Sequence, residues 1–238
     1  MIRHRFIPLS GPLFLVLAAL TLGLGACGDD DETTTTATTT TAATTGPTGA
    51  GGAAAADGGS AFIDRSTGEA TGLKPDTRRG TVPPPQETDD LEQAAKAAGC
   101  ELRLDLPDEG NTHIPRSKTP TYKTNPPTSG DHDATPLADG AYLDAPQERF
   151  FVHSMEHGRV VIQYQSSLPE DDQLALKGLF EEDPDGMILL QNPDMPYAVA
   201  ATAWTNGLGC DSYSPEAIDA IRAFRDEFRG KGPEDIPL

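Results

Sequence analysis

The residues of this chain that are best suited to chemistry gather around one short segment. Positions 153–157 read His-Ser-Met-Glu-His, which puts two imidazoles, a carboxylate and a thioether into five residues. Imidazole and carboxylate groups bind metal ions and transfer protons near neutral pH. Two further histidines, His113 and His132, lie upstream of the segment. This density of histidines is the main indication of function, and it does not identify a substrate.

A metal site is the first interpretation of these side chains. Neutral imidazole binds zinc, copper, iron and nickel, and three such ligands leave a coordination position for water or substrate. Met155 would add a soft ligand that favours copper, and the nearby glutamate would bind the metal, orient a ligand or act as a base. We therefore predict a divalent transition metal, zinc or copper, as the cofactor. The predicted ligands are His113, His132, His153, Glu156 and His157. The alternative is a hydrogen-bonded histidine cluster that only fixes a loop.

The elements on either side of this segment have the composition of strands. Residues 149–152 and 159–164 are rich in β-branched and aromatic side chains, and Gly158 is the strong turn former between them. The sequence therefore predicts a hairpin with His153 and His157 at its tip. Two histidines four residues apart also fit one face of a helix, but the flanking residues favour strands.

A long polar segment precedes the hairpin and supplies the other histidines. Residues 107–140 are rich in proline and contain the string PPTSGDH at positions 126–132. A loop of this length inside a compact domain is usually functional. The two prolines restrict its backbone and Gly130 permits a tight turn. We expect this loop to fold over the hairpin tip and to bring His132 to the other imidazoles.

The rest of the chain predicts an α+β fold. Helical patterns cover residues 88–98, 169–182 and the segment after Ser214, and strand patterns cover residues 101–106, 187–190 and 197–204. Helices and strands mix without a βαβ rhythm, so we expect a mainly antiparallel sheet of about four or five strands with two or three helices. Residues 88–238 have the usual size of one domain.

The N-terminal residues predict export and lipid attachment. Residues 1–26 begin with basic residues and continue with an apolar run, as signal peptides do. Small residues before Cys27 are similar to the lipobox of bacterial lipoproteins, so Cys27 is the expected lipid site, and an ordinary signal peptide is the alternative. Residues 27–87 are rich in Thr, Ala, Gly and Pro and predict a disordered tether. We therefore expect a protein anchored to the cell membrane by lipid and facing its extracytoplasmic side.

The other two cysteines are Cys100 and Cys210, and each lies beside a glycine. In an oxidising compartment such a pair predicts a disulfide, and two buried thiols are the alternative. A cysteine metal site is disfavoured because the chain has no CxxC spacing.

The charge of the chain bears on its partners. It carries 37 acidic and 18 basic residues, a net charge of −19. This balance argues against nucleic acid or anionic lipid as a partner, because both are polyanions. A lipid on Cys27 remains the predicted contact with the membrane.

Several strings of the chain resemble a bacterial family catalogued as domain of unknown function 3105. They are Gly99-Cys100, His113, Tyr122, PPTSGDH, Gly140-Ala-Tyr142, VHSMEHGRVVIQY, the NPDMP turn and AVAATAW, in that order. The resemblance spans about residue 89 to the C-terminus. It implies an extracytoplasmic domain after a signal or anchor, and it places His132, His153, Glu156 and His157 in the family's motifs. It implies no activity. The chain departs from the pattern at Met155, where leucine is expected, and at residues 207–209.

Two further function classes stay open. Ser129-Gly-Asp-His132 has a faint likeness to the ligand spacing of zinc-dependent cell-wall hydrolases, although it is wrong by one residue. The other hypothesis is a non-catalytic envelope module that binds peptide, glycan or protein. Elemental analysis of the purified protein distinguishes the metal-binding hypothesis from the binding-module hypothesis.

Overall fold

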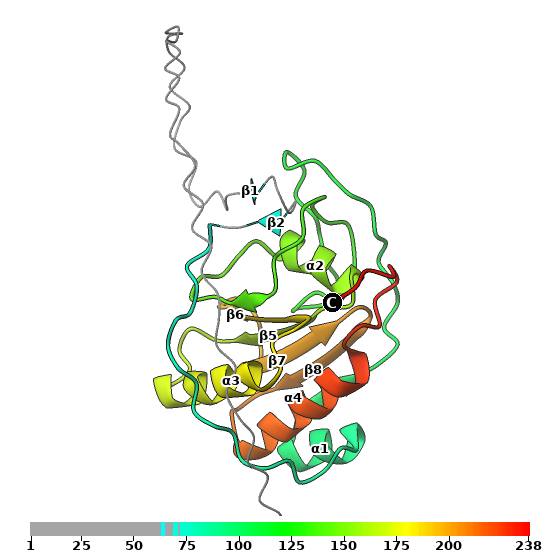
Figure 1. The fold of residues 1–238 in the computed structure, drawn as a ribbon. Helices are drawn as coiled ribbons and strands as arrows, with labels where there is room; N and C mark the ends of the chain where they lie inside the picture. Colours follow the sequence, from blue (N-terminus) through cyan, green and yellow to red (C-terminus); the bar gives the residue numbers. More distant parts are fainter. Residues whose placement is uncertain (1–62, 65–68, 71) are drawn as a thin grey trace, which may run out of the picture. The chain divides into compact units, whose positions relative to one another are not determined.

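The structure, a computed structural model, describes residues 63–64, 69–70 and 72–238. Its centre is a six-stranded mixed sheet of order β3-β8-β7-β5-β6-β4 (Figure 1). The strands are β3 (Glu101–Arg103), β4 (Gly140–Ala141), β5 (Val160–Tyr164), β6 (Met187–Gln191), β7 (Val199–Ala203) and β8 (Asn206–Cys210). Two short strands, β1 (Ile63–Asp64) and β2 (Glu69–Ala70), pair with each other. The predicted α+β class is confirmed, with more strands than the four or five expected.

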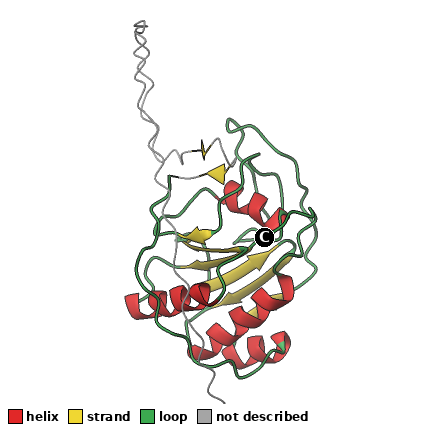
Figure 2. Cartoon of the chain, in the orientation of Figure 1, coloured by secondary structure: helices red, strands yellow, loops and turns green. Residues whose placement is uncertain are grey.

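Four helices cover the two faces of the six-stranded sheet (Figures 1 and 2). They are α1 (Leu91–Ala98), α2 (Glu148–Glu156), α3 (Glu170–Glu182) and α4 (Pro215–Phe228). The alternation of side chains along β5 separates the faces: Ile162 packs into a core with α1, α3 and α4, whereas Val161 packs into a second core with α2. Helix α2, which carries the histidine segment, therefore has one face of the sheet to itself among these helices.

Helices α1 and α4 begin and end at the capping residues expected from the sequence. The carboxylate of Asp90 accepts from the backbone N–H of Gln93 and begins α1, and Gly99 ends it with a φ of 66°. Ser214 caps α4 in the same way, with Pro215 in its first turn.

The sheet differs from the prediction in its connections. Strands β4 and β5 are both parallel to β6, α2 joins β4 to β5 and α3 joins β5 to β6, so the chain does contain βαβ crossovers. Strand β8 was not predicted, because its sequence NGLGC has two glycines and no β-branched residue. Predicted strand 101–106 ends at Arg103, since Asp105 has a φ of 51° and Leu104 is exposed.

The predicted hairpin at residues 149–164 is wrong in its first half. Its second half is β5, but residues 148–156 form α2, and Gly158 joins the two with a φ of 80°. The helix is explained by the spacing of Phe151, Val152 and Met155, which lie on one helical face and pack against the sheet. β-Propensity is overridden because this segment is buried on its other side as well.

Residues 72–87, which belong to the predicted tether, pack on the domain. The N–H of Asp76 donates to the carbonyl of Ala141 at 2.8 Å, which covers the edge strand β4. Further along, an added Cβ at Gly178 of α3 would lie 1.7 Å from the carbonyl oxygen of Thr81. The folded part of the chain therefore begins before residue 88. The predicted signal peptide at residues 1–26 and the predicted lipid site Cys27 lie outside the described residues.

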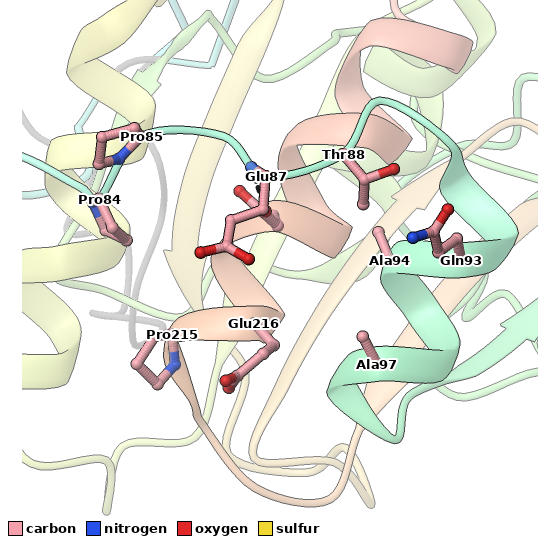
Figure 3. A pocket seen from close by; sticks show the side chains of 10 residues that line it. Pro84, Pro85, Glu87, Thr88, Gln93, Ala94, Ala97, Pro215 and Glu216 are labelled. Atoms are coloured by element: carbon pink, nitrogen blue, oxygen red, sulfur yellow. Dashed lines mark hydrogen bonds between the residues drawn. The ribbon is translucent and has the colours of Figure 1, made fainter. Parts of the chain in front are cut away.

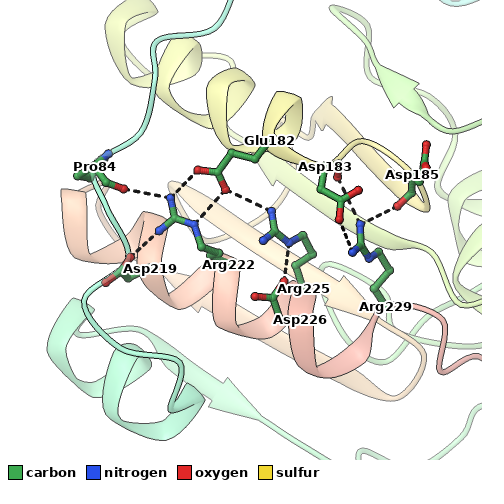
Figure 4. Close-up of polar contacts among 9 residues, drawn as sticks. All are labelled: Pro84, Glu182, Asp183, Asp185, Asp219, Arg222, Arg225, Asp226 and Arg229. Atoms are coloured by element: carbon green, nitrogen blue, oxygen red, sulfur yellow. Dashed lines mark hydrogen bonds and ion pairs between the residues drawn. The ribbon is translucent and has the colours of Figure 1, made fainter. Parts of the chain in front are cut away.

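Helices α3 and α4 are joined by ion pairs (Figure 4). Arg222 and Arg225 both bind the carboxylate of Glu182, at 2.8 and 3.4 Å, and Arg229 binds Asp183 at 2.5 Å. These contacts fix the end of α3 against the side of α4.

The predicted disulfide between Cys100 and Cys210 is present. It links the start of β3 to the end of β8, which are neighbours in the sheet. No helix in the described part of the chain is long and apolar enough to cross a membrane.

Candidate metal centre

Four of the five predicted ligands come together in one group. Nitrogen atoms of His113, His132 and His153 and a carboxylate oxygen of Glu156 all lie within 4.8 Å of one another. Two of these residues lie on α2, at a spacing of three that places them on neighbouring positions of one helical face. The other two lie on the long loop, whose role in the site is as predicted, although the loop covers a helix and not a hairpin tip.

The ring of His132 is held by its own loop. Its Nδ1 lies 2.8 Å from the carbonyl oxygen of Gly130, which only accepts, so Nδ1 carries the proton. In the neutral ring Nε2 then has a bare lone pair, and it lies 3.0 Å from Oε2 of Glu156. The side chains of both residues are essentially inaccessible to solvent, at 0% and 1% exposure. Within the described chain neither of these two atoms makes a hydrogen bond.

His153 is held in the same manner from the other side. Its Nδ1 donates to the carbonyl of Asp133 at 2.7 Å, which again leaves Nε2 as the acceptor nitrogen of the ring. Burial lowers the pKa of His153 to about 3, although the carbonyl of Asp133 opposes this shift. His153 is therefore neutral at pH 7 and offers a lone pair from Nε2.

His113 forms the exposed side of the group. Its side chain is 46% exposed, and its Nε2 lies 3.8 Å from Oε2 of Glu156. An isolated parallel bridge pairs His113 with His132. The N–H of Ile114 donates to the carbonyl of His132, and the N–H of His132 donates to the carbonyl of Thr112, so these two segments of the loop are held side by side. The ring centroids of His113 and His153 are 4.6 Å apart. The group is thus buried on three sides and reaches solvent at His113.

The fifth predicted ligand, His157, lies beside the group and not in it. Its Nε2 is 3.0 Å from Nε2 of His153 and 3.2 Å from a carboxylate oxygen of Glu234 on the C-terminal tail. Burial lowers the pKa of His157, while the charge of Glu234 opposes the shift. Sequence reasoning missed Glu234, because a polar tail residue far along the chain carries no signal of its position.

A buried ion pair fastens the long loop to α2. The guanidinium of Arg149 donates to the carbonyls of Lys118 and Ile114 at 2.8 and 2.9 Å, and its Nε lies 3.3 Å from a carboxylate oxygen of Asp133. Asp133 also supplies the carbonyl that orients His153. Arg149 was read as a strand residue in the sequence, and its role in positioning the site was missed.

Met155 takes no part in the site. Its side chain is fully buried in the apolar core between α2 and the sheet, with Val152 and Ile188. The additional soft ligand considered from the sequence is not offered here, because a helix turns position 155 away from positions 153 and 156. The donors that remain are nitrogen and oxygen.

The comparison with known families identifies the region that contains this site. Residues 113–236, more than half of the chain, match the family described as protein of unknown function (DUF3105). The chain belongs to the DUF3105 family. The DUF3105 region begins at His113 and includes every residue of the group together with His157 and Glu234. It leaves out α1, β3 and Cys100, although the resemblance in the sequence begins near residue 89. No curated protein and no solved structure matches the chain.

A separate pocket of the DUF3105 protein lies on the other side of the sheet. It has a volume of about 220 Å³ and lies between the segment at Pro84, α1 and the start of α4 (Figure 3). Its lining includes the carboxylates of Glu87, Glu216 and Asp219 but no histidine, cysteine or lysine. It therefore offers much less chemistry than the histidine group.

Proposed function

We propose that this DUF3105 domain binds a divalent transition-metal ion through His113, His132, His153 and Glu156. The single observation that carries the proposal is their convergence from two loop segments and one helix into a buried group whose ligand atoms lie within 4.8 Å of one another. Ligands around a tetrahedral zinc ion lie about 3.4 Å apart, so small side-chain movements would close the group on an ion.

The hydrogen bonds around the group support this proposal. His132 and His153 each give the Nδ1 proton to a backbone carbonyl, which is the usual arrangement of metal-binding histidines because it fixes the tautomer and the ring orientation. The result is a lone pair on Nε2 of each of these two rings. Without a cation or an added proton, the bare Nε2 of His132 and the carboxylate oxygen of Glu156 repel each other at 3.0 Å. A divalent cation between them would turn this repulsion into two bonds.

The donor set narrows the choice of metal. Three imidazoles and one carboxylate, with the sulfur of Met155 in the core, suit zinc, copper(II) and other borderline ions better than copper(I). The exposure of His113 suits a ligand position that opens to solvent or to a substrate.

We further propose that the site faces the outside of the cell membrane on a lipid-anchored protein. The apolar N-terminal segment with Cys27 at its end supports this proposal, as does the disulfide, which suits an oxidising compartment. Mass spectrometry of the purified protein tests it, since a lipid-modified cysteine is expected as the mature N-terminus, and an unmodified Cys27 would reject it.

Metal binding is tested by elemental analysis and by calorimetric titration of the chelator-treated full chain with Zn²⁺ and Cu²⁺. We expect Glu156→Gln and His153→Ala to lower the affinity by at least about tenfold, a loss that even residues outside the ligand shell cause. Asp131→Asn, which removes an exposed charge from the same loop, is the matched control and should keep the wild-type affinity.

The metal-free proteins give a second readout. Glu156→Gln has nearly the same shape as the wild type, and its amide can donate to Nε2 of His132, so its metal-free form should unfold at the same or a higher temperature than the wild type. The stabilisation that added metal gives the wild type should be lost. Wild-type protein that binds no metal would make the histidines structural. The domain would then be better regarded as a binding module, for which the cleft of about 610 Å³ beside Tyr122 and Glu148 is the candidate surface.

A further inference from the structure

The C-terminal tail is built against the end of α2. The N–H of Gly230 donates to the carbonyl of Gly158 at 2.8 Å, and the N–H of Glu234 donates to the carbonyl of Glu156 at 3.1 Å. Between them, an added Cβ at Gly232 would lie 2.2 Å from the carbonyl oxygen of Glu156, so this approach requires glycine. The tail is therefore held by its backbone beside a residue of the candidate centre (Figure 1).

This placement creates a second set of three potential ligands. Nε2 of His157 lies 3.0 Å from Nε2 of His153 and 3.2 Å from a carboxylate oxygen of Glu234. These separations are close to the spacing of ligands on one ion, about 3.4 Å for a tetrahedral site. His157 is largely buried, whereas the carboxylate of Glu234 is 45% exposed and closes the set on the solvent side.

We infer that the centre holds two divalent cations, an inner one at His113, His132 and Glu156 and an outer one at His153, His157 and Glu234. The inference rests on the proposed metal-binding function, extends it from one ion to two, and transfers His153 from the inner ion to the outer one. His153 has one free lone pair and can serve only one ion, so its contact with His157 assigns it to the outer position. Each position then has two imidazoles and one carboxylate from the protein.

The two sets of three side chains lie next to each other in the fold. Two-metal centres place their ions about 3.5–4 Å apart. A ring nitrogen of His153 lies within 4.8 Å of a ligand atom of each of the three inner residues, so ions bound to the two sets would be neighbours. The two carboxylates offset part of the charge that two cations bring. The class of ligand is a pair of first-row divalent ions, for which nitrogen and oxygen donors are suited.

The test counts the ions. The chelator-treated full chain is titrated with Zn²⁺ and its bound metal is measured by elemental analysis. Two ions per chain are expected for the wild type, and one for Glu234→Ala and for His157→Ala, with at least about a tenfold loss of affinity at the outer position alone. Asp235→Ala removes the neighbouring exposed carboxylate of the same tail and should keep two ions.

A second variant moves the tail and leaves all six ligands in the sequence. Gly232→Val cannot keep the approach to the carbonyl of Glu156, so it should also reduce the count from two to one. A wild-type protein with one ion overturns the inference, and it leaves the proposed function intact when Glu156→Gln removes that ion. A wild-type protein with no ion rejects both. Two ions that persist in Glu234→Ala and His157→Ala also overturn the assignment.

Electron paramagnetic resonance gives an independent readout. In the protein loaded with two equivalents of Cu²⁺, the two neighbouring ions should couple magnetically. The spectrum should therefore be weaker than that of two isolated Cu²⁺ ions. In Glu234→Ala the remaining ion should give the uncoupled spectrum. An uncoupled spectrum from the doubly loaded wild type would contradict a paired site.

Discussion

The two faces of the sheet are stabilised in different ways. The face that carries α1, α3 and α4 buries a continuous set of apolar side chains, and a disulfide and paired charges such as Arg222 with Glu182 reinforce it. The face that carries α2 also buries polar atoms that make no hydrogen bond in the described chain, among them Nε2 of His132 and Oε2 of Glu156. Buried polar groups cost free energy unless they are paired, whereas apolar burial is favourable by itself. The first face therefore supplies most of the stability. The second face holds groups that can take part in chemistry, and their burial lowers the free energy of unfolding.

The largest expected effect separates stability from metal binding. The double variant Cys100→Ser with Cys210→Ser removes a link between residues 110 positions apart, which the chain-entropy model values at about 5 kcal/mol. Denaturant unfolding should show this loss in the free energy of unfolding. At temperatures where the variant is still folded, its metal affinity should match the wild type, because the bridge lies on the edge of β3 and β8 and not at α2. A variant with unchanged stability would contradict the expectation.

The next largest effect is expected at Arg149, where one substitution should lower both the stability and the metal affinity. Arg149→Met removes a guanidinium that binds three loop carbonyls and Asp133, so it leaves a buried carboxylate short of a partner and should cost about 3 kcal/mol. Metal affinity should fall too, because Asp133 orients His153. The matched control is Arg116→Met, whose half-exposed side chain pairs with the same carboxylate and should cost less than about 1 kcal/mol. Equal losses in the two variants would show that Arg149 does not position the site.

A smaller effect is expected where residues 72–87 cross α3. Glycine to alanine inside a helix ordinarily stabilises it by about 1 kcal/mol. At Gly178 the sign should reverse, because the new Cβ would lie 1.7 Å from the carbonyl oxygen of Thr81. We expect Gly178→Ala to cost about 1–3 kcal/mol and to speed proteolytic cleavage within residues 72–87, as overpacking does. Stabilisation with unchanged cleavage would mean that this segment does not pack on the domain in solution.

The same difference between the faces decides what the sequence predicts. Helices α1 and α4 follow from local caps and periodic apolar residues, so residues 88–98 and the segment after Ser214 were predicted well. The cysteine pair was predicted from composition and compartment. On the other face, the ligand types were predicted, because histidine and glutamate in one segment are visible in any sequence.

The geometry of the site was predicted less well, and the causes are long-range. Helix α2 replaces a predicted strand because its β-prone residues are buried on two sides, which periodicity does not reveal. The roles of Arg149 and Glu234 depend on contacts with distant residues: Arg149 binds the carbonyl of Lys118, 31 positions away, and Glu234 contacts His157, 77 positions away. No local pattern encodes such contacts. Residue types therefore indicated the chemistry, but only the folded chain selects which side chains meet.

The smallest expected effect tests whether the apolar and polar sides of α2 are truly separate. Met155 lies in the core with Val152 and Ile188, one residue from Glu156 in sequence but on the other side of the helix. Met155→Leu preserves volume and apolar character, so it should cost less than about 1.5 kcal/mol, and the affinity for Zn²⁺ and Cu²⁺ should not change. Met155→Ala is the companion variant, because it should lower the free energy of unfolding by about 2–5 kcal/mol through a cavity and still keep the metal preference of the folded protein. A selective loss of copper binding in Met155→Leu would place the sulfur among the ligands, which this orientation of α2 does not allow.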